Sequence, residues 1–282
     1  MVKKIALTAD STCDLPKELQ AKYNVTLIPL TITMGSGTYR DGIDLVYTDL
    51  FAYFDRTKQL PKTSAPSPAL YQEIFQRLTD QGYEVIHLSL DSEISSSYNN
   101  ACFIAKDFPN VHVIDSKNIC GSVSLMLIHA GEMINAGKDA DEIVAELERI
   151  VPLAHTSFVI DTLTYLYKGG RCSALAMLAS SVLVVKPCIE MRDGIMVVGK
   201  KYRRNPKQLI KQYLTDMLTG VEVDKDAPIF VANTYYNEEL AEYAYSILKY
   251  EFGFKEVIIV KAGSIISTHC GPNTIGLFFI SK

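Results

Sequence analysis

Apolar and polar positions along the first half of the chain alternate between two periods. Short apolar runs of strand length recur at residues 4–9, 25–33, 84–90 and 111–115. Between them, apolar residues repeat every three to four positions, which is the period of an amphipathic helix. We therefore expect helices at residues 47–57, 68–81, 98–107, 122–136 and 140–151. Strands that alternate with helices predict an α/β fold with a mainly parallel sheet and helices on both of its faces.

The second half of the chain has a different pattern. Strand-like runs lie at residues 156–161, 188–191, 195–200, 229–234, 257–261 and 276–280. Helical periodicity marks residues 163–167, 175–183, 205–218 and 238–251. The tripeptide Arg192-Asp193-Gly194 is a strong hairpin signal between two of these strands. We predict an α+β arrangement with a mixed sheet here, and divide the chain into domains 1–155 and 156–282.

Composition and charge narrow the function classes. The 282 residues are 48% apolar and 21% charged, which is typical of a globular protein. A net charge of −4 argues against nucleic acid as a partner, because neutralising phosphates requires a basic surface. No apolar run is both uninterrupted and as long as the ~20 residues of a membrane span, and the amino-terminal run is too short for a signal peptide. We expect a cytoplasmic protein without an integral membrane segment.

Sequence motifs offer little support for metal or cofactor chemistry. The six cysteines form no C-x-x-C pair, so we interpret them as buried free thiols and expect no metal site. The tripeptide Gly35-Ser36-Gly37 lacks the third glycine and the following helix of a dinucleotide fingerprint. Asp10 and Asp14 could form a general acid–base pair of a hydrolase or phosphotransferase. Alternatively, Asp14 caps the helix that begins after Pro16, and Asp10 fastens a loop.

Hydroxyl-bearing segments precede two predicted helices. Thr63 opens the run Thr-Ser-Ala-Pro-Ser-Pro, and Ser95 opens the run Ser-Ser-Ser-Tyr. Such hydroxyls commonly cap helices by accepting hydrogen bonds from free N–H groups. The same helix ends can bind a carboxylate or phosphate, because they carry partial positive charge. Both interpretations hold together.

Two isolated residues and one basic cluster are the remaining candidates for a binding or partner site. His269 lies before Gly271-Pro272 in what we expect to be a turn-prone loop. Arg171 follows Gly169-Gly170, either as a surface side chain after a helix end or as an anion or partner contact. Five basic residues fall close together in an acidic chain: Lys200, Lys201, Arg203, Arg204 and Lys207. They form either a solvated face or a docking patch.

The order of these motifs resembles the DegV family, whose members resemble fatty-acid-binding proteins. The resemblance rests on seven segments that span the chain: residues 10–16, 41–42, 63–68, 95–101, 113–116, 168–171 and 269–272. Each segment is weak alone, and their conjunction and order are specific. One departure is Ser96, which stands where the family usually has glycine and so restricts that backbone position.

The resemblance implies a two-domain carrier rather than an enzyme. It implies one long-chain fatty acid (palmitate, stearate or oleate) in a buried tunnel, with the carboxylate held by Thr63, Ser95 and His269. Asp10, Ser11 and Arg171 would be supporting or partner-facing, as would Arg203 and Arg204 in the basic cluster. The implied partner is a fatty acid kinase that makes an acyl-phosphate, and no cofactor is implied. The apolar run Leu175, Met177, Leu178, Val182 and Leu183 either lines the tunnel or forms a core helix.

Overall fold

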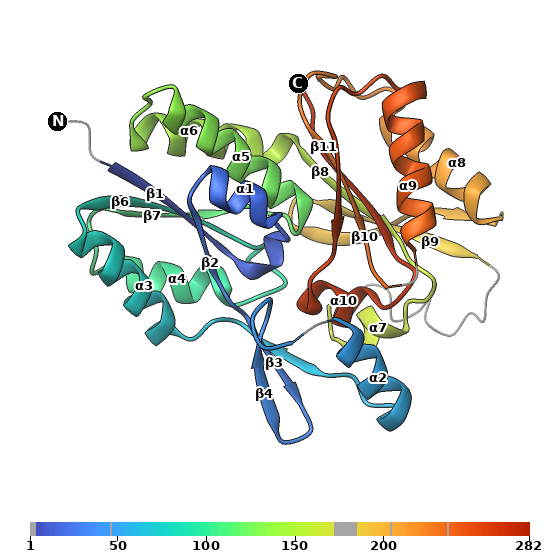
Figure 1. Ribbon diagram of the computed structural model, residues 1–282, viewed down its shortest axis with the longest axis horizontal. Helices are drawn as coiled ribbons and strands as arrows, with labels where there is room; N and C mark the ends of the chain where they lie inside the picture. The colour runs from blue at the N-terminus through green and yellow to red at the C-terminus, as the bar shows by residue number, and fades with distance from the viewer. Residues whose placement is uncertain (1–3, 46, 172–184, 204, 236) are drawn as a thin grey trace.

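The first sheet of the computed structural model is parallel throughout. The structure describes residues 4–45, 47–171, 185–203, 205–235 and 237–282. Four strands lie in the order β2-β1-β6-β7 (Figure 1). Their bounds are β1 Lys4–Asp10, β2 Val25–Ile28, β6 Tyr83–Ser89 and β7 Val111–Asp115. Most of β1 and β6 is buried, as expected where helices cover both faces of a sheet.

Helices cover both faces of this sheet, as the alternating pattern predicts. On one face lie α3 (Pro68–Asp80) and α4 (Ser97–Ala105), which share a core with Ala6 and Val85. On the other lie α5 (Gly121–Asn135) and α6 (Ala140–Ile150), as Figure 1 shows. The short α1 (Lys17–Lys22) follows Pro16. The predicted fold class of the first half is therefore confirmed.

The second sheet is mixed, as predicted. Its six strands lie in the order β10-β9-β8-β13-β11-β12, and only β11 and β12 are parallel neighbours. The bounds are β8 Ala154–Val159, β9 Lys186–Arg192, β10 Ile195–Tyr202, β11 Ile229–Asn233, β12 Val257–Lys261 and β13 Ile275–Ile280. The hairpin between β9 and β10 turns at Asp193 and Gly194, both with positive φ. The domain division at residue 155 stays a prediction.

Helix α5 connects the two sheets. One face of the second sheet packs on α8 (Pro206–Leu218) and α9 (Glu238–Ser246), which continues as a π-helical turn (Ile247–Glu251). The other face packs on α5, whose residues 121–128 are all buried. A Cβ atom at Gly121 would lie 2.8 Å from the ring of Phe278, so only glycine permits this close approach. The two sheets thus share one apolar core.

Short elements gather at the end of the second sheet. They are α2 (Tyr47–Thr57), α7 (Thr164–Lys168) and α10 (Ser264–Cys270). The 3₁₀ turn Val151–Leu153 lies at the opposite end, just before β8. Figure 1 shows α2, α7 and α10 side by side beneath that sheet. The expected loop around His269 is wrong, since His269 lies on α10. None of the helices in the described ranges combines the length and hydropathy of a bilayer-spanning segment.

The predicted strand at residues 25–33 is two strands. β2 ends at Ile28, and β3 (Thr31–Met34) pairs with β4 (Gly37–Arg40) and β5 (Lys62–Ser64) in a small antiparallel sheet. Pro29 separates them, because proline cannot donate to a strand ladder. The predicted helix at residues 175–183, with its candidate tunnel walls, lies outside the described residues.

Candidate functional site

Four predicted site residues line one small cavity. Thr63 on β5, Ser95 before α4, Arg171 after α7 and His269 on α10 surround a space of about 50 Å³. Thr63 and His269 are 206 positions apart, yet the Thr63 Oγ1 and His269 Nε2 atoms lie 2.9 Å from each other. The fold therefore gathers these polar groups from both halves of the chain.

The remaining walls of this cavity are mostly apolar. They comprise Leu30, Leu90, Ile94, Ile119, Leu166, Met196, Ile265 and Ile266, together with Thr12, Ser64, Ala65 and Cys270. A neighbouring space of about 20 Å³ shares Ile119, Ile266 and Cys270, and continues between Phe158 and Phe278. A polar end on an otherwise apolar cavity suits a ligand with one polar group and a long apolar part.

His269 is neutral at physiological pH. Burial, together with the charge of Arg171, lowers the pKa of its imidazole to about 3. A neutral imidazole has one donor and one acceptor nitrogen, so Nε2 either donates a hydrogen bond to the Thr63 hydroxyl or accepts one from it, depending on the tautomer. The buried Nδ1 atom has no hydrogen-bond partner among the described residues. A Cβ atom at Gly169 would collide with that nitrogen, so glycine there makes room for the ring.

Arg171 links two loops beside the cavity. Its Nη1 donates to the Gly169 carbonyl at 2.7 Å, and its Nε donates to the Ile94 carbonyl at 3.4 Å. Burial lowers the pKa of its guanidinium, which nevertheless stays charged at neutral pH. No carboxylate pairs with Arg171 within the described ranges. Among the described residues, the site therefore holds a partly buried cation without a carboxylate partner.

The two hydroxyl segments differ in their local roles. Ser95 Oγ accepts a hydrogen bond at 3.2 Å from the backbone N–H of Ser97, the first residue of α4, although Ser96 occupies the cap position. Thr63 does not stand at a helix end, which corrects our expectation. It lies mid-strand opposite Ile32, and the cap of α3 is Ser67, whose Oγ accepts from Leu70 N. Thr63 owes its place to the small sheet, which the sequence pattern missed.

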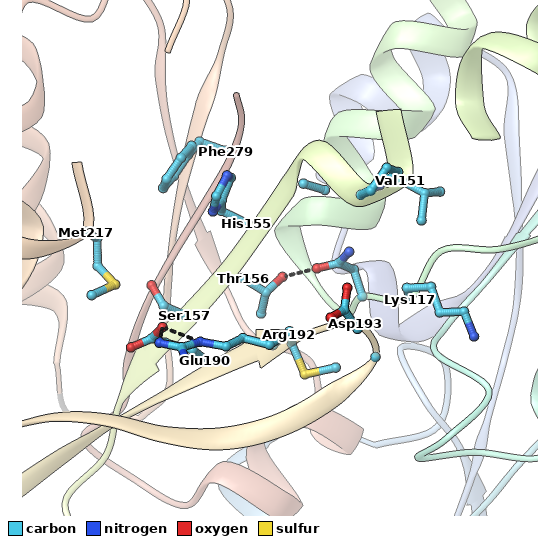
Figure 2. A pocket seen from close by; sticks show the side chains of 15 residues that line it. Lys117, Val151, His155, Thr156, Ser157, Glu190, Arg192, Asp193, Met217 and Phe279 are labelled. Atoms are coloured by element: carbon cyan, nitrogen blue, oxygen red, sulfur yellow. Dashed lines mark hydrogen bonds and ion pairs between the residues drawn. The ribbon is translucent and has the colours of Figure 1, made fainter. Parts of the chain in front are cut away.

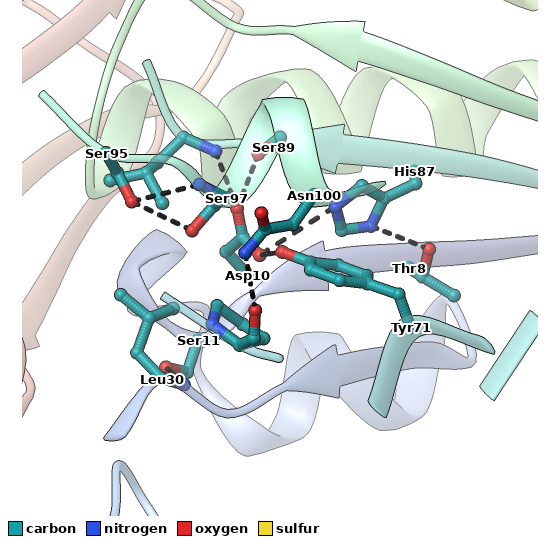
Figure 3. Close-up of polar contacts among 12 residues, drawn as sticks. Thr8, Asp10, Ser11, Leu30, Tyr71, His87, Ser89, Ser95, Ser97 and Asn100 are labelled. Atoms are coloured by element: carbon teal, nitrogen blue, oxygen red, sulfur yellow. Dashed lines mark hydrogen bonds and ion pairs between the residues drawn. The ribbon is translucent and has the colours of Figure 1, made fainter. Parts of the chain in front are cut away.

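Asp10 does not line this cavity but belongs to a buried polar network beside it, as Figure 3 shows. Its carboxylate accepts hydrogen bonds from Tyr71 Oη at 2.6 Å, Ser89 Oγ at 2.7 Å and Leu90 N at 2.9 Å. His87 lies alongside, and burial lowers the pKa of its ring. These contacts bind the ends of β1 and β6 to α3, in line with the loop-fastening interpretation of Asp10.

Ser11 also makes internal contacts. It donates to Asp41 Oδ2 at 2.6 Å and accepts from Leu30 N at 3.2 Å, and it does not line the cavity. The helix-capping prediction for Asp14 is wrong, because Pro16 occupies the cap position of α1. Asp14 instead adopts a left-handed conformation with φ 54°. This conformation turns its carboxylate toward α10, where it accepts from Gly263 N at 2.9 Å.

A larger cavity of about 550 Å³ lies elsewhere, between β8, β9 and the loop before α5 (Figure 2). Its walls include the ion pair of Glu190 with Arg192 at 2.9 Å, together with Lys117 and His155. None of the predicted site residues lines it. A long apolar chain is poorly suited to this cavity, because contact with these groups would desolvate charges without replacing their hydration.

The basic cluster is partly neutralised. Lys200 pairs with Asp216 at 2.8 Å, and Lys207 pairs with Glu239 at 2.8 Å. Lys201 and Arg203 are exposed, whereas Arg204 lies outside the described residues. In the part of the chain that the structure describes, no group of three or more His, Cys, Asp or Glu side chains is placed to hold a metal.

Comparison with known proteins identifies the family. A family model described as "Uncharacterised protein, DegV family" matches residues 4–282. The chain belongs to the DegV family. A DegV domain-containing protein of Caldanaerobacter subterraneus is 30% identical over 285 residues, and the match covers 100% of each chain.

Two solved DegV-type structures are similar over their whole length. A DegV family protein of Thermus thermophilus, described by its fatty acid binding, is 25% identical with a TM-score of 0.89. That match covers 99% of this chain and 100% of the other. A protein of Eubacterium ventriosum, described as stearic-acid-binding, is 29% identical with a TM-score of 0.83, covering 100% of this chain and 99% of that one. The fold described above is therefore that of the DegV structures.

Proposed function

We propose that this protein binds one long-chain fatty acid in the cavity lined by Thr63, Ser95 and His269. The observation that carries the proposal is an apolar cavity whose polar end combines hydroxyl groups, the neutral imidazole of His269 and the guanidinium of Arg171. Its support also comes from the DegV proteins of similar fold that are described as fatty-acid-binding. Palmitate, stearate and oleate are the ligands we would test.

The carboxylate is held by hydroxyl and imidazole groups rather than by a fixed ion pair. Thr63 and Ser95 each supply an O–H donor, and the tautomer of His269 with a proton on Nε2 supplies an N–H donor. A hydrogen bond to a charged acceptor contributes about 1.5–3 kcal/mol. Arg171 lies close enough to favour the anion, because it lines the same cavity.

The hydrocarbon chain supplies most of the affinity. Burial of about 14 methylenes of a C16 chain is worth roughly 11 kcal/mol at ~0.8 kcal/mol each, before the costs of association. Cavities for ligands of this size typically measure about 300–1,000 Å³. The described space of about 50 Å³ is smaller than this, so binding of a whole fatty acid requires it to widen.

We further propose that the protein is a carrier that presents the carboxylate to a fatty acid kinase. In that reaction a carboxylate oxygen attacks the γ-phosphorus of ATP, ADP leaves, and an acyl-phosphate forms. A carboxylate held by neutral donors keeps an oxygen lone pair for this attack. Arg171 and Arg203 are the side chains we propose to face the kinase; the predicted role of Arg204 falls outside the described residues. Asp10 and Asp14 are both engaged in internal hydrogen bonds, and no observation favours a hydrolase or phosphotransferase built on them.

Lipid extraction tests the binding proposal. Purified protein is denatured and extracted, and the extract is analysed by mass spectrometry; delipidated protein is then titrated with palmitate. We expect one fatty acid per chain and a higher melting temperature on rebinding. Thr63→Val should weaken palmitate binding. Its control is Thr33→Val, on the same small sheet but not lining the cavity. Absence of fatty acid from the extract, together with no uptake of palmitate or oleate, would refute the proposal.

A further inference from the structure

Helix α10 determines much of the shape of the candidate site. Ile265, Ile266, His269 and Cys270 all line the cavity, and all four lie on this helix. The helix is only seven residues long, so few of its hydrogen bonds are internal. A helix this short depends on what holds its ends, and any displacement of α10 moves the imidazole and one apolar wall together.

Two carboxylates from the amino-terminal part of the chain hold the start of α10. Asp14 Oδ1 accepts from Gly263 N at 2.9 Å. Asp41 Oδ1 accepts from Ser264 N at 3.1 Å and from Ile265 N at 3.4 Å. These are the free N–H groups of the first turn, and the residues that satisfy them are more than two hundred positions away.

Each of the two carboxylates is held in place by a further hydrogen bond to its second oxygen. Asp14 Oδ2 accepts from the thiol of Cys120, at the start of α5, at 3.0 Å. Asp41 is 3% exposed, and its second oxygen accepts from Ser11 Oγ at 2.6 Å. A Cβ atom at Gly263 would lie 2.7 Å from Asp14 Oδ1, so any larger residue would push the two apart. Neither aspartate lines the cavity.

We propose that Asp14 and Asp41 are positioning residues of the fatty-acid site, which hold α10 and thereby set His269 and the wall formed by Ile265 and Ile266. The expected effect of these residues on fatty-acid binding rests on the proposed function. The positioning role extends that function to two residues that do not touch the cavity. The contacts join the amino-terminal segment to α10, so they also connect the two halves of the chain at the polar end of the site.

Asp14 lies among other titratable side chains. The titratable groups that face Asp14 are the carboxylate of Asp41 and the thiols of Cys13, Cys120 and Cys270. Burial, with a contribution from Asp41, raises the pKa of Asp14 to about 7. Burial and Asp41 therefore oppose ionisation of Asp14, whereas the hydrogen bond from Gly263 N favours the ionised carboxylate.

The experiment compares Asp41→Ala with Asp139→Ala. Asp139 caps α6 by accepting from Glu142 N at 2.9 Å, far from the cavity, so its variant controls for loss of a helix cap. Each protein is measured for palmitate affinity and, without fatty acid, for hydrogen exchange across residues 263–271. We expect Asp41→Ala to weaken palmitate binding by about ten-fold, the lower end of what a lost hydrogen bond to a charged group costs, and to speed exchange in α10. Asp139→Ala should do neither.

Gly263→Ala is the second variant, should Asp41→Ala fail to fold. Its added methyl group displaces Asp14 while leaving Asp41 in place, and we expect the same changes in exchange and affinity. Palmitate affinity equal to wild type in a folded variant would overturn the proposal. If wild type binds no fatty acid at all, the proposed function fails. In that case the hydrogen-exchange data alone test whether the two aspartates hold α10. Exchange in α10 at the wild-type rate in the variants overturns that part of the proposal.

Discussion

Replacement of Asp14 by asparagine should change how stability depends on pH. The asparagine amide imitates the protonated acid, because its oxygen can still accept from Gly263 N while its nitrogen faces the sulfur of Cys120. In wild type the pKa of Asp14 is about 7, against an ordinary value of 3.8. Folding therefore opposes ionisation of this group. Ionisation of Asp14 therefore lowers the free energy of unfolding. This loss is absent below the pKa of Asp14 in the unfolded chain, grows between pH 4 and 7, and is complete above pH 7.

The size of the effect follows from the shift. About three pKa units at 1.36 kcal/mol each correspond to an upper bound of about 4 kcal/mol. The side chain is partly exposed, and solvent screening reduces this value, so we expect about 2–4 kcal/mol. Asp14→Asn should thus match wild type near pH 4 and exceed its free energy of unfolding by this amount at pH 8. Titrations elsewhere in the chain cancel in the difference.

Urea unfolding at a series of pH values measures this difference. The chain has no tryptophan, so far-UV circular dichroism is a better probe than intrinsic fluorescence. Asp139→Asn is a matched control, because Asp139 caps a helix at the surface. A difference between Asp14→Asn and wild type that is constant with pH would refute the argument. So would a variant that is less stable than wild type at pH 8, since that would mean the carboxylate is stabilised as an anion.

Three further predictions concern the candidate site and its partner. Thr63→Val and Ser95→Ala should each weaken palmitate binding at least several-fold while circular dichroism stays unchanged, because each removes a hydrogen bond to the carboxylate; wild-type affinity in both would place the head group elsewhere. Gly169→Ala should displace the imidazole of His269 and lower affinity by a similar factor in calorimetric titration, and an unchanged titration would contradict this close approach. Arg203→Glu should slow acyl-phosphate formation by a cognate kinase, most at low salt, without altering palmitate affinity. Equal rates for the variant and wild type at all salt concentrations would show that Arg203 does not contact the kinase.

The two larger sheets were predictable because their strands and helices carry strong periodic signals. The runs at residues 4–9 and 84–90 are buried on both faces, and both became strands of the parallel sheet. The helix α10 was not predictable in the same way. Its first N–H groups are satisfied by Asp14 and Asp41, which are far away in sequence, so the local residues carry no capping signal. The wrong prediction for Asp14 has the same origin, since a local capping rule was overridden by a long-range contact.

The candidate site was predicted by resemblance more than by pattern. The motifs pointed to Thr63, Ser95 and His269 together, and the structure brings all three to one cavity. Their local setting was inferred less well, because Thr63 depends on a three-stranded sheet of short strands whose pairing is not local. The neutral state of His269 could not be inferred either, since it depends on burial between α7, α10 and β5. The role of these residues in binding stays a prediction.

A crystal structure of the delipidated protein reloaded with palmitate tests the central claim most directly. The account predicts one palmitate per chain, with its carboxylate oxygens within hydrogen-bond distance of Thr63 Oγ1 and Ser95 Oγ and its chain against Leu90, Ile119 and Ile266. A palmitate that lies instead in the larger cavity beside Arg192, or a head group that contacts neither hydroxyl, would contradict it.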